Sequence, residues 1–514
     1  MDDINMINNA TMSHHFKSIE KRCYKQISTC KCCVPVLLWS LAAWVLLLHA
    51  YTSLLRVPSR LPEPQSQWQM TSPLIYHDAD KQSAQKMEVE MIEMVDGIAQ
   101  MEVEKVRNWN KLEENVDLEE TFGAAALAKP MTTAKAPEES KEALARRKLA
   151  LLFPDKSSAI DPSKVNGSEY GYFYPGQEWL DSAGRPIQAH GGGVMHVAET
   201  HTYYWYGENK DGATKYSPKQ GTARVDVLGI SCYSSKDLWT WHYLGLALKA
   251  ERRDKSSDLY FTNVVERPKV IYNDRTKQYI MWMHIDNANY SKAAVGVAVS
   301  PNPEGPFEYV GSKRPHGCDS RDMTIFQDDD GEAYLIYSSL GNSELHIGPL
   351  TEDYMDVVER GSQKVLVKER REAPVVFKHH GMYYMVTSGC TGWAPNGALV
   401  HAAESMLGPW VTLGDPCVGG EEEFRSFTFF SQGTFVLPLP GLENTFIFMA
   451  DRWRPADLRD SRYVWLPLTM DGPADEPSDD EFEFPLWLRV SIHWYEKWKL
   501  PEGRDNQHRE LSSL

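Results

Sequence analysis

The chain has 514 residues, enough for one large domain with accessory segments. Hydrophobic residues make up 42% and aromatic residues 11%, so the chain can build a large core with many aromatic residues left for its surface. The formal net charge of −17 argues against a nucleic-acid partner, because proteins that bind nucleic acids present a basic face.

Residues 32–51 form an apolar run that contains no Asp, Glu, Lys or Arg. About 20 such residues suffice to cross a bilayer. A cleaved signal peptide is the alternative, but it would start earlier and end at a small-residue cleavage site. Basic residues ahead of the run place the tail 1–31 in the cytosol: Lys17, Lys21, Arg22, Lys25 and Lys31. We therefore expect a single-pass type II anchor, with the rest of the chain in the lumen of the Golgi.

The eight cysteines divide between the two sides of this anchor. Four lie beside the membrane on the cytosolic side, where S-acylation is expected rather than metal binding: Cys23, Cys30, Cys32 and Cys33. The other four fall in an oxidising compartment and allow three disulfide pairings, among which the spacing does not choose: Cys232, Cys318, Cys390 and Cys417. Two glycosylation sequons, at Asn166 and Asn289, are lumenal in this topology, whereas the one at Asn9 is cytosolic.

Residues 52–160 have the composition of a stem and linker. Met87 to Trp109 carries apolar residues at helical spacing among many glutamates. This pattern predicts either a short coiled coil that joins two chains into a homodimer or a solvated amphipathic helix with weak self-association, and the second reading is slightly favoured. A flexible linker at 125–138 and a second helix over Ser140–Leu152 complete the stem.

From about residue 161 to 470 the sequence indicates an all-β domain. Five times, a polar residue stands just ahead of a short apolar run, at intervals of 76, 56, 50 and 60 residues: His190, Glu266, Asp322, Glu372 and Gln432. A period of roughly 50 residues rich in short strands is typical of a β-propeller, in which the innermost strands converge on one axis. The five polar residues are therefore expected to meet in one funnel. The extension 471–514 is expected to pack on the propeller or to complete a blade.

Carboxylates in this set can serve glycoside hydrolysis. One carboxyl group protonates the leaving oxygen, and a second group activates water or attacks the sugar. The acid must stay protonated at its working pH, so burial or a neighbouring carboxylate must raise its pKa. Glu372 and Asp322 suit this pairing if adjacent blades bring them together.

Several segments resemble glycoside hydrolase family 43, and more narrowly its exo-β-1,3-galactanase branch. Two of them are SRDMTIFQDDDGEAYLIYSS and REAPVVFKHHGMYYMVTSG, which are similar to the segments with the modulating Asp and the general-acid Glu. The narrower likeness is in IQAHGGGVMH, YYWYGENK, VERPKVIYN and SGCTGWAPN. The resemblance covers roughly Gly171 to Leu468. It implies a five-bladed propeller without a cofactor or catalytic metal, which removes galactose from β-1,3-galactan, the backbone of arabinogalactan-type glycans, with inversion.

The resemblance also implies roles for single residues. Glu372 would be the proton donor and Asp322 its modulator. The start of blade one lacks the Asp that most of the family uses as a base, and Gln432 would hold the water instead. Gln432 would then either act through a proton-relay tautomer or position the water while Glu266 or Glu208 takes the proton. Glu208 and Glu266 would bind hydroxyl groups of the terminal galactose. The residues themselves add further substrate-binding candidates: Trp393 as a stacking platform, with core packing as the alternative, Thr391 as a hydroxyl partner, Tyr206 in either of these roles, and His190 in the funnel.

Two other classes of function remain open from the sequence. A catalytically inactive propeller that binds glycans as a lectin would explain the missing base. A Golgi glycosyltransferase would share the anchor-and-stem layout, and the run 328–330 could pass for a metal-binding Asp-x-Asp motif. A hairpin turn explains that run better, because it precedes Gly331 between two predicted strands.

Overall fold

The computed structural model describes residues 150–165, 167–217, 222–439, 442, 444–455, 457–470 and 489–501. Several predicted features lie outside these residues: the cytosolic tail, the anchor at 32–51, the stem helix at 87–109, most of the helix at 140–152 and the sequon at Asn166. Within the described ranges, no helix has the length and apolarity needed to traverse a bilayer.

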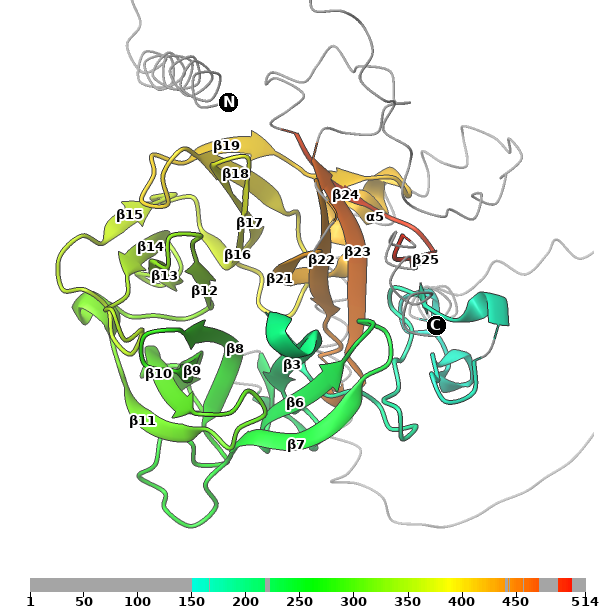
Figure 1. The fold of residues 1–514 in the computed structure, drawn as a ribbon, viewed down its shortest axis with the longest axis horizontal. Coiled ribbons are helices and arrows are strands. Elements are labelled where there is room, and N and C mark those ends of the chain that lie inside the picture. The colour runs from blue at the N-terminus through cyan, green and yellow to red at the C-terminus, as the bar shows by residue number, and fades with distance from the viewer. Residues whose placement is uncertain are drawn as a thin grey trace, which may run out of the picture. The chain divides into compact units, whose positions relative to one another are not determined.

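Five antiparallel sheets make up the domain and surround a common centre (Figure 1). Blade one contains β2 (His190–Val197), β3 (Thr202–Glu208), β6 (Gly229–Ser235) and β7 (His242–Lys249). Blade two contains β8 (Val264–Asn273), β9 (Gln278–Asp286), β10 (Ala294–Ser300) and β11 (Glu308–Lys313). Blade three contains β12 (Met323–Gln327), β13 (Ala333–Ser339), β14 (Glu344–Pro349) and β15 (Gln363–Val365). Blade four contains β16 (Arg371–His379), β17 (Met382–Gly389), β18 (Leu399–Ala403) and β19 (Val411–Gly414).

Blade five is built from the C-terminal part of the chain and has five strands. Four are antiparallel neighbours, β21 (Gln432–Pro438), β22 (Thr445–Arg452), β23 (Arg462–Met470) and β24 (Val490–His493). The fifth, β20 (Cys417–Val418), pairs in parallel with β24. The extension beyond residue 470 thus completes a blade, one of its two expected roles.

The inner strands close a ring. In order around the axis, β2 contacts β8, β8 contacts β12, β12 contacts β16, β16 contacts β21, and β21 contacts β2 again. This closure is the five-bladed propeller that the repeat predicted, and it brings the first and last blades together without an exposed sheet edge at the centre.

Short elements lie outside the blades. β1 (Tyr172–Phe173) pairs with β25 (Trp498–Lys499), and β4 (Thr214–Ser217) pairs with β5 (Thr222–Val225) in a hairpin inserted between β3 and β6. The described helices are short: α5 (Glu422–Ser426), η2 (Lys156–Ser158), η3 (Gly167–Glu169), η4 (Ala198–Thr200), η5 (Pro315–Gly317), η6 (Thr428–Phe430) and η7 (Leu458–Asp460).

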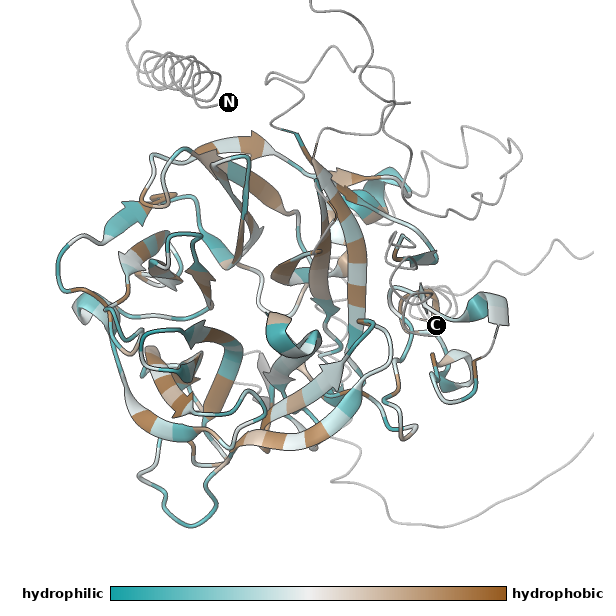
Figure 2. Cartoon of the chain, viewed as in Figure 1, coloured by the Kyte–Doolittle hydropathy of each residue, from teal (hydrophilic) through white to brown (hydrophobic). Residues whose placement is uncertain are grey.

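The core lies between neighbouring blades, because each strand alternates residues toward the two faces of its sheet. Brown bands alternate with pale bands along β7 and β23 (Figure 2). Between blades five and one, an aromatic cluster includes Trp179, Trp205, Trp465 and Trp498. Trp498, from the segment after β24, belongs to this cluster.

The four cysteines after the predicted anchor form no disulfide. Cys232, Cys318, Cys390 and Cys417 are all free thiols. They belong to different parts of the ring, because Cys232 lies in β6 and Cys417 in β20, while Cys318 and Cys390 lie in loops of other blades. The compartment-based expectation of a disulfide framework is therefore corrected.

Candidate active site

The five polar residues stand at corresponding places in the five inner strands. His190 and Gln432 are the first residues of β2 and β21, and Glu372 is the second residue of β16. Glu266 is the third residue of β8, and Asp322 directly precedes β12. Because these strands form one ring, the five residues lie around one end of the propeller axis, as the repeat predicted.

A β-bulge follows the polar residue in four of the five blades. Each inner strand gains one residue relative to its partner, between His190 and Gly193, Glu266 and Lys269, Glu372 and Val375, and Gly433 and Phe435. In three blades the next residue has a left-handed backbone: Gly191 (φ 62°), Arg267 (φ 56°) and Ala373 (φ 48°). Bulges re-aim side chains and are common beside active sites. The repeated bulge thus sets the direction of the site side chains.

Glycine is required at the first of these bulges. A Cβ on Gly191 would stand 2.1 Å from Oε1 of Glu208, and one on Gly207 would stand 2.0 Å from the backbone carbon of Ala189. Both contacts are far too close for any side chain. The glycines therefore let β2 approach β3 and leave room for the carboxylate of Glu208.

Glu372 is buried, and two side-chain amides donate hydrogen bonds to its carboxyl group. Asn342 donates to Oε2 across 2.8 Å, and Gln432 donates to Oε1 across 3.3 Å. Burial raises the pKa of Glu372, and the negative charge of Asp322 raises it further, to about 8, although Arg267 acts in the opposite direction. A carboxyl group that is protonated at neutral pH can act as a general acid.

Arg267 joins three blades at the centre of the site. One guanidinium nitrogen donates to Asp322 across 2.9 Å and to the side-chain oxygen of Gln432 across 2.6 Å. The other terminal nitrogen donates to the carbonyl of Gly433 across 3.0 Å. The carboxylate of Asp322 and the side-chain amide of Gln432 are therefore fixed relative to each other by one buried cation.

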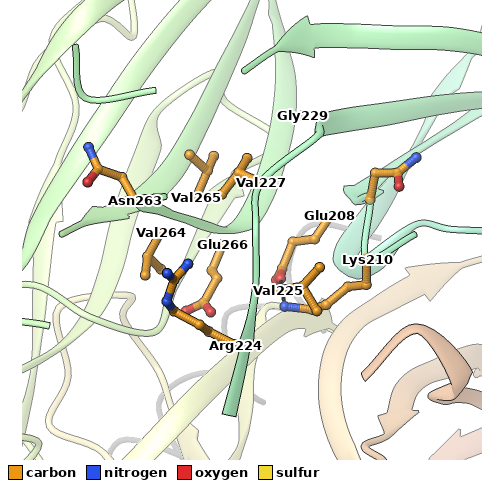
Figure 3. A pocket seen from close by; sticks show the side chains of 11 residues that line it. Glu208, Lys210, Arg224, Val225, Val227, Gly229, Asn263, Val264, Val265 and Glu266 are labelled. Carbon is orange, nitrogen blue, oxygen red and sulfur yellow. Dashed lines mark ion pairs between the residues drawn. The ribbon is translucent and has the colours of Figure 1, made fainter. Parts of the chain in front are cut away.

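Glu208 and Glu266 line a pocket in blades one and two, shown in Figure 3. Lys210 lies 2.5 Å from Oε2 of Glu208, and the backbone N–H of Arg267 donates to Oε1 across 3.0 Å. Burial raises the pKa of Glu208 despite these contacts. Burial would also raise the pKa of Glu266, but a hydrogen bond with His284 and the charge of Lys210 hold that pKa at about 2.

Trp393, the predicted stacking platform, lies beside Lys210, which lines this pocket. Its ring meets the ring of Trp453 edge-on, with 5.0 Å between centroids. The ammonium of Lys210 stands 5.2 Å from the centre of Trp393 and 5.5 Å from that of Trp453. Cation–π contacts of this kind fix both the lysine and the rings.

Three predicted substrate-binding residues are placed differently. Tyr206 lies two residues before the end of β3 and faces the core between blades one and two, so it is only 1% exposed. Its hydroxyl donates to the carbonyl of Pro303. His190 is fully buried, with Nδ1 3.2 Å from Asp451 and its ring stacked on Tyr463. Thr391 is exposed, but its hydroxyl donates to Ala394 within its own loop. The structure therefore brings neither Tyr206 nor His190 to an open surface.

The structure also adds residues that the sequence analysis did not name: Arg267, Lys210, Asn342, Tyr290, His284 and Trp453. Arg267 directly follows Glu266, and Lys210 comes two residues after Glu208. Their closeness in sequence to these predicted residues could have indicated them. Asn342 and Tyr290 come from loops between strands, and no pattern in the sequence points to them.

Asn342 is held by an unusual loop. Leu340, Gly341 and Asn342 all have positive φ, at 48°, 63° and 61°. Asp319 accepts hydrogen bonds from the backbone N–H groups of Leu340 and Gly341, across 2.9 and 3.1 Å. This carboxylate holds the strained turn that presents Asn342 to the acid.

The run 328–330 forms the turn between β12 and β13, as predicted. The N–H of Asp328 donates to Glu332 across 2.7 Å, and the N–H of Gly331 donates to Asp328 across 3.0 Å. The carboxylate of Asp328 contacts Lys378 and Tyr383 of blade four. The run is therefore a hairpin with a structural ion pair. Across the described part of the chain, no three His, Cys, Asp or Glu side chains are grouped to hold a metal ion.

Comparison with known proteins agrees with this geometry. The model of the family described as glycosyl hydrolases family 43 matches residues 183–423. A solved β-1,3-galactosidase of that family, bound to galactodeoxynojirimycin, is 35% identical, with 64% of this chain and 100% of that chain covered and a TM-score of 0.56. The chain belongs to glycoside hydrolase family 43. The resemblance stated from its motifs is confirmed at this level.

Other members of the family are also similar. The exo-β-1,3-galactanase of Phanerochaete chrysosporium, solved with galactose, is 39% identical, covering 58% of this chain and 64% of that chain at a TM-score of 0.51. The enzyme of the same description from Clostridium thermocellum is 34% identical over 64% of this chain and 67% of that chain, at 0.54. A curated β-D-galactofuranosidase of Aspergillus niger is 26% identical over 39% of this chain. The chain spans 60% of that relative's length, and 63% of another solved family 43 β-1,3-galactosidase.

Proposed function

We propose that this chain is an exo-acting, inverting galactosidase that releases terminal galactose from β-1,3-galactan, the backbone of arabinogalactan-type glycans. The observation that carries the proposal is the buried Glu372, whose pKa is raised to about 8 by burial and by Asp322. The substrate is inferred from the neighbours, which are a β-1,3-galactosidase and exo-β-1,3-galactanases of family 43.

In this proposal Glu372 protonates the glycosidic oxygen, and the bond between that oxygen and the anomeric carbon of the terminal galactose breaks. An inverting enzyme needs a water on the opposite face of the sugar, activated by a second group. Blade four holds the acid, and blades one and two, which hold Glu208 and Glu266, are the two that do not adjoin it in the ring. Glu208 is the stronger proton acceptor of the pair, because burial raises its pKa while the pKa of Glu266 is held at about 2.

The direct test is incubation of the purified full-length chain with linear β-1,3-galactan. We expect free galactose as the product, released from the non-reducing end, with no accumulation of intermediate oligosaccharides. Release from β-1,4-galactan at an equal rate would contradict the proposed linkage. Manganese-dependent transfer from a nucleotide sugar would instead indicate a glycosyltransferase.

A glycan-binding propeller without activity is the second candidate. Two observations favour it. The oxygen and the nitrogen of the Gln432 side chain are both fully engaged by protein partners. In addition, the inner strand of blade one begins with His190 and not with a carboxylate. Binding of β-1,3-galactan by the wild-type chain with no galactose released over long incubation would support this function over hydrolysis.

We also propose a type II topology in which residues 32–51 anchor the chain and the propeller lies in the Golgi lumen, with the stem as a candidate dimer contact. Asn289, in the turn after β9, is exposed and so accessible to glycosylation. Asn289→Gln and Ser291→Ala should each remove one N-glycan from the cellular protein. Digestion of the propeller by protease added outside sealed vesicles would contradict the topology.

A further inference from the structure

Glu266 is held by two side chains from blade two. The hydroxyl of Tyr290 donates to Oε1 across 3.0 Å, and Nδ1 of His284 lies 3.4 Å from Oε2. His284 stands opposite Glu266 in the register of β9 and β8. The carboxylate also lines the pocket that contains Glu208 and Lys210. Glu266 therefore faces the pocket on one side and a histidine on the other.

The histidine lies between two carboxylates. Its Nε2 is 3.1 Å from Oδ2 of Asp286, and His284 and Asp286 have side-chain exposures of 2% and 0%. The second oxygen of Asp286 accepts from the backbone N–H groups of Asn287 and Lys292, across 2.9 and 2.7 Å. These two bonds close the loop that carries Tyr290. Asp286 thus supports both of the groups that hold Glu266.

The charges of this network reinforce one another. Burial would lower the pKa of His284, but the two carboxylates raise it to about 9. Burial would raise the pKa of Glu266, but His284 and Lys210 bring it to about 2. The titratable groups that face the imidazole are Glu266, Asp286 and Tyr290, and the hydroxyl of Tyr290 has a pKa well above its ordinary value because it is buried beside Glu266. A cationic imidazole between two anions is the state that this arrangement favours.

We propose that His284 and Asp286 are positioning residues, which hold Glu266 as a fixed, fully charged acceptor for hydroxyl groups of the terminal sugar. The identity of that sugar rests on the proposed function. The positioning of Glu266 by His284 and Asp286 does not depend on which sugar binds. Each oxygen of the Glu266 carboxylate has one partner from blade two, Tyr290 at Oε1 and His284 at Oε2, and keeps a further lone pair for a ligand hydroxyl. Such charge-assisted hydrogen bonds are stronger than neutral ones.

The first test needs no sugar. The full-length chain is labelled with ¹⁵N-histidine, and the ring of His284 is titrated by NMR after assignment with the His284→Asn variant. We expect an imidazolium at pH 7 that loses its proton near pH 9, and a downward shift of this titration in Glu266→Gln. A neutral ring at pH 7, or an unchanged titration in Glu266→Gln, would overturn the proposal.

The second test measures binding of galactose by calorimetry in a Glu372→Gln background, where the acid cannot titrate. We expect constant affinity up to about pH 8 and a fall as His284 deprotonates. His284→Asn, which keeps a neutral donor near the Nδ1 position, should bind roughly tenfold more weakly and without this pH dependence. The same affinity and pH profile as its parent would overturn the proposal.

His346 provides a matched control. It is a buried histidine of blade three, 2.7 Å from Glu344 through Nε2 and 3.1 Å from the hydroxyl of Tyr337 through Nδ1. His346→Asn should cost stability but leave galactose affinity and its pH profile unchanged. If His284→Asn alone does not fold, the double variant His284→Asn with Asp286→Asn removes both charges and should show the same flat profile. If the Glu372→Gln parent does not bind galactose, the result counts against the proposed function. The NMR titration still tests whether His284 and Asp286 hold Glu266 in its charged form.

Discussion

The side-chain amide of Gln432 donates to the carboxyl group of Glu372 across 3.3 Å. The residue expected to hold the attacking water therefore touches the acid itself. Its amide nitrogen also donates to Ser388 across 2.9 Å, and its oxygen accepts from Arg267 and Trp453 across 2.6 and 2.9 Å. Through these bonds Gln432 links the acid to the Arg267–Asp322 ion pair. To bind water it must release one of these four partners.

We predict that Gln432→Ala loses most activity and keeps galactose affinity nearly intact. The water it positions matters in the transition state more than in the ground state, and its removal also takes a donor from Glu372. Steady-state kinetics together with calorimetric titration of galactose check this. Gln432→Glu is the informative second variant, since it offers a carboxylate where the amide stood and should recover part of the loss. If Gln432→Ala turns over substrate at the wild-type rate, Gln432 does not position the attacking water, and Glu208 or Glu266 must position and activate it alone.

The same reaction predicts the anomer of the product. ¹H NMR recorded early in the reaction should show α-galactose first, because inversion of a β-linkage gives the α-anomer. Initial appearance of β-galactose would mean a retaining mechanism and would remove the need for a positioned water on the opposite face.

We expect Glu372→Gln to lower turnover of β-1,3-galactobiose by roughly 10²–10⁴-fold, the usual contribution of a general acid. An aryl galactoside with an activated leaving group needs little protonation, so its turnover should fall much less. The ratio of the two losses is the measurement. Equal losses on both substrates would show that Glu372 does not deliver the proton.

Asp322→Asn should move the alkaline limb of the pH profile. Glu372 acts in its protonated form, so activity falls as pH rises through its pKa of about 8. Burial contributes most to that raised pKa and Asp322 contributes next, while Arg267 opposes them. Without the negative charge of Asp322, the positive charge of Arg267 is no longer balanced and lowers the pKa of Glu372 further. The limb measured from kcat/KM should therefore shift to lower pH, and an unshifted limb would exclude Asp322 as the modulator.

The ring of blades and the acid pair could be predicted from the sequence because both depend on periodic features. Each inner strand begins near a polar residue, and the interval between these residues counts the blades. The alternation along strands then assigns the core. Glu372 and Asp322 follow from this reasoning, since they occupy corresponding places in adjacent blades.

The remainder of the site depends on geometry that leaves no such pattern. Arg267 and Ala373 have left-handed backbones without being glycine, so the bulges that aim Glu266 and Glu372 have no sequence signal. Tyr206 was expected at the site, two residues before Glu208 in the same strand. Residues two apart share a face of a strand at different positions along it, and Tyr206 lies in the core. The Asn342 loop depends on Asp319, which is 23 residues away in sequence and adjacent in space.

Glu372 should also make the propeller less stable at alkaline pH. Its pKa of about 8 in the folded state exceeds the ordinary value of about 4.3. Folding therefore favours the protonated form, and this contribution to stability is complete below pH 4.3 and lost as pH rises to about 8. Glu372→Gln cannot ionise, so its stability relative to wild type should increase between pH 5 and pH 8, by an amount on the order of a few kcal/mol. Urea unfolding at the two pH values measures this difference.

Glu266 has a pKa shift of the opposite sign. Its pKa is lowered to about 2, so its contribution to stability is present above its unfolded value near 4.3 and is lost only as pH falls from there toward 2. Glu266→Gln should therefore destabilise the propeller at both pH values, and by less at pH 8, because the substitution also lowers the pKa of His284, whose contribution to stability is lost as pH rises toward 9. If Glu372→Gln shows the same stability difference from wild type at both pH values, the carboxyl group of Glu372 is not protonated at neutral pH and cannot supply the proton.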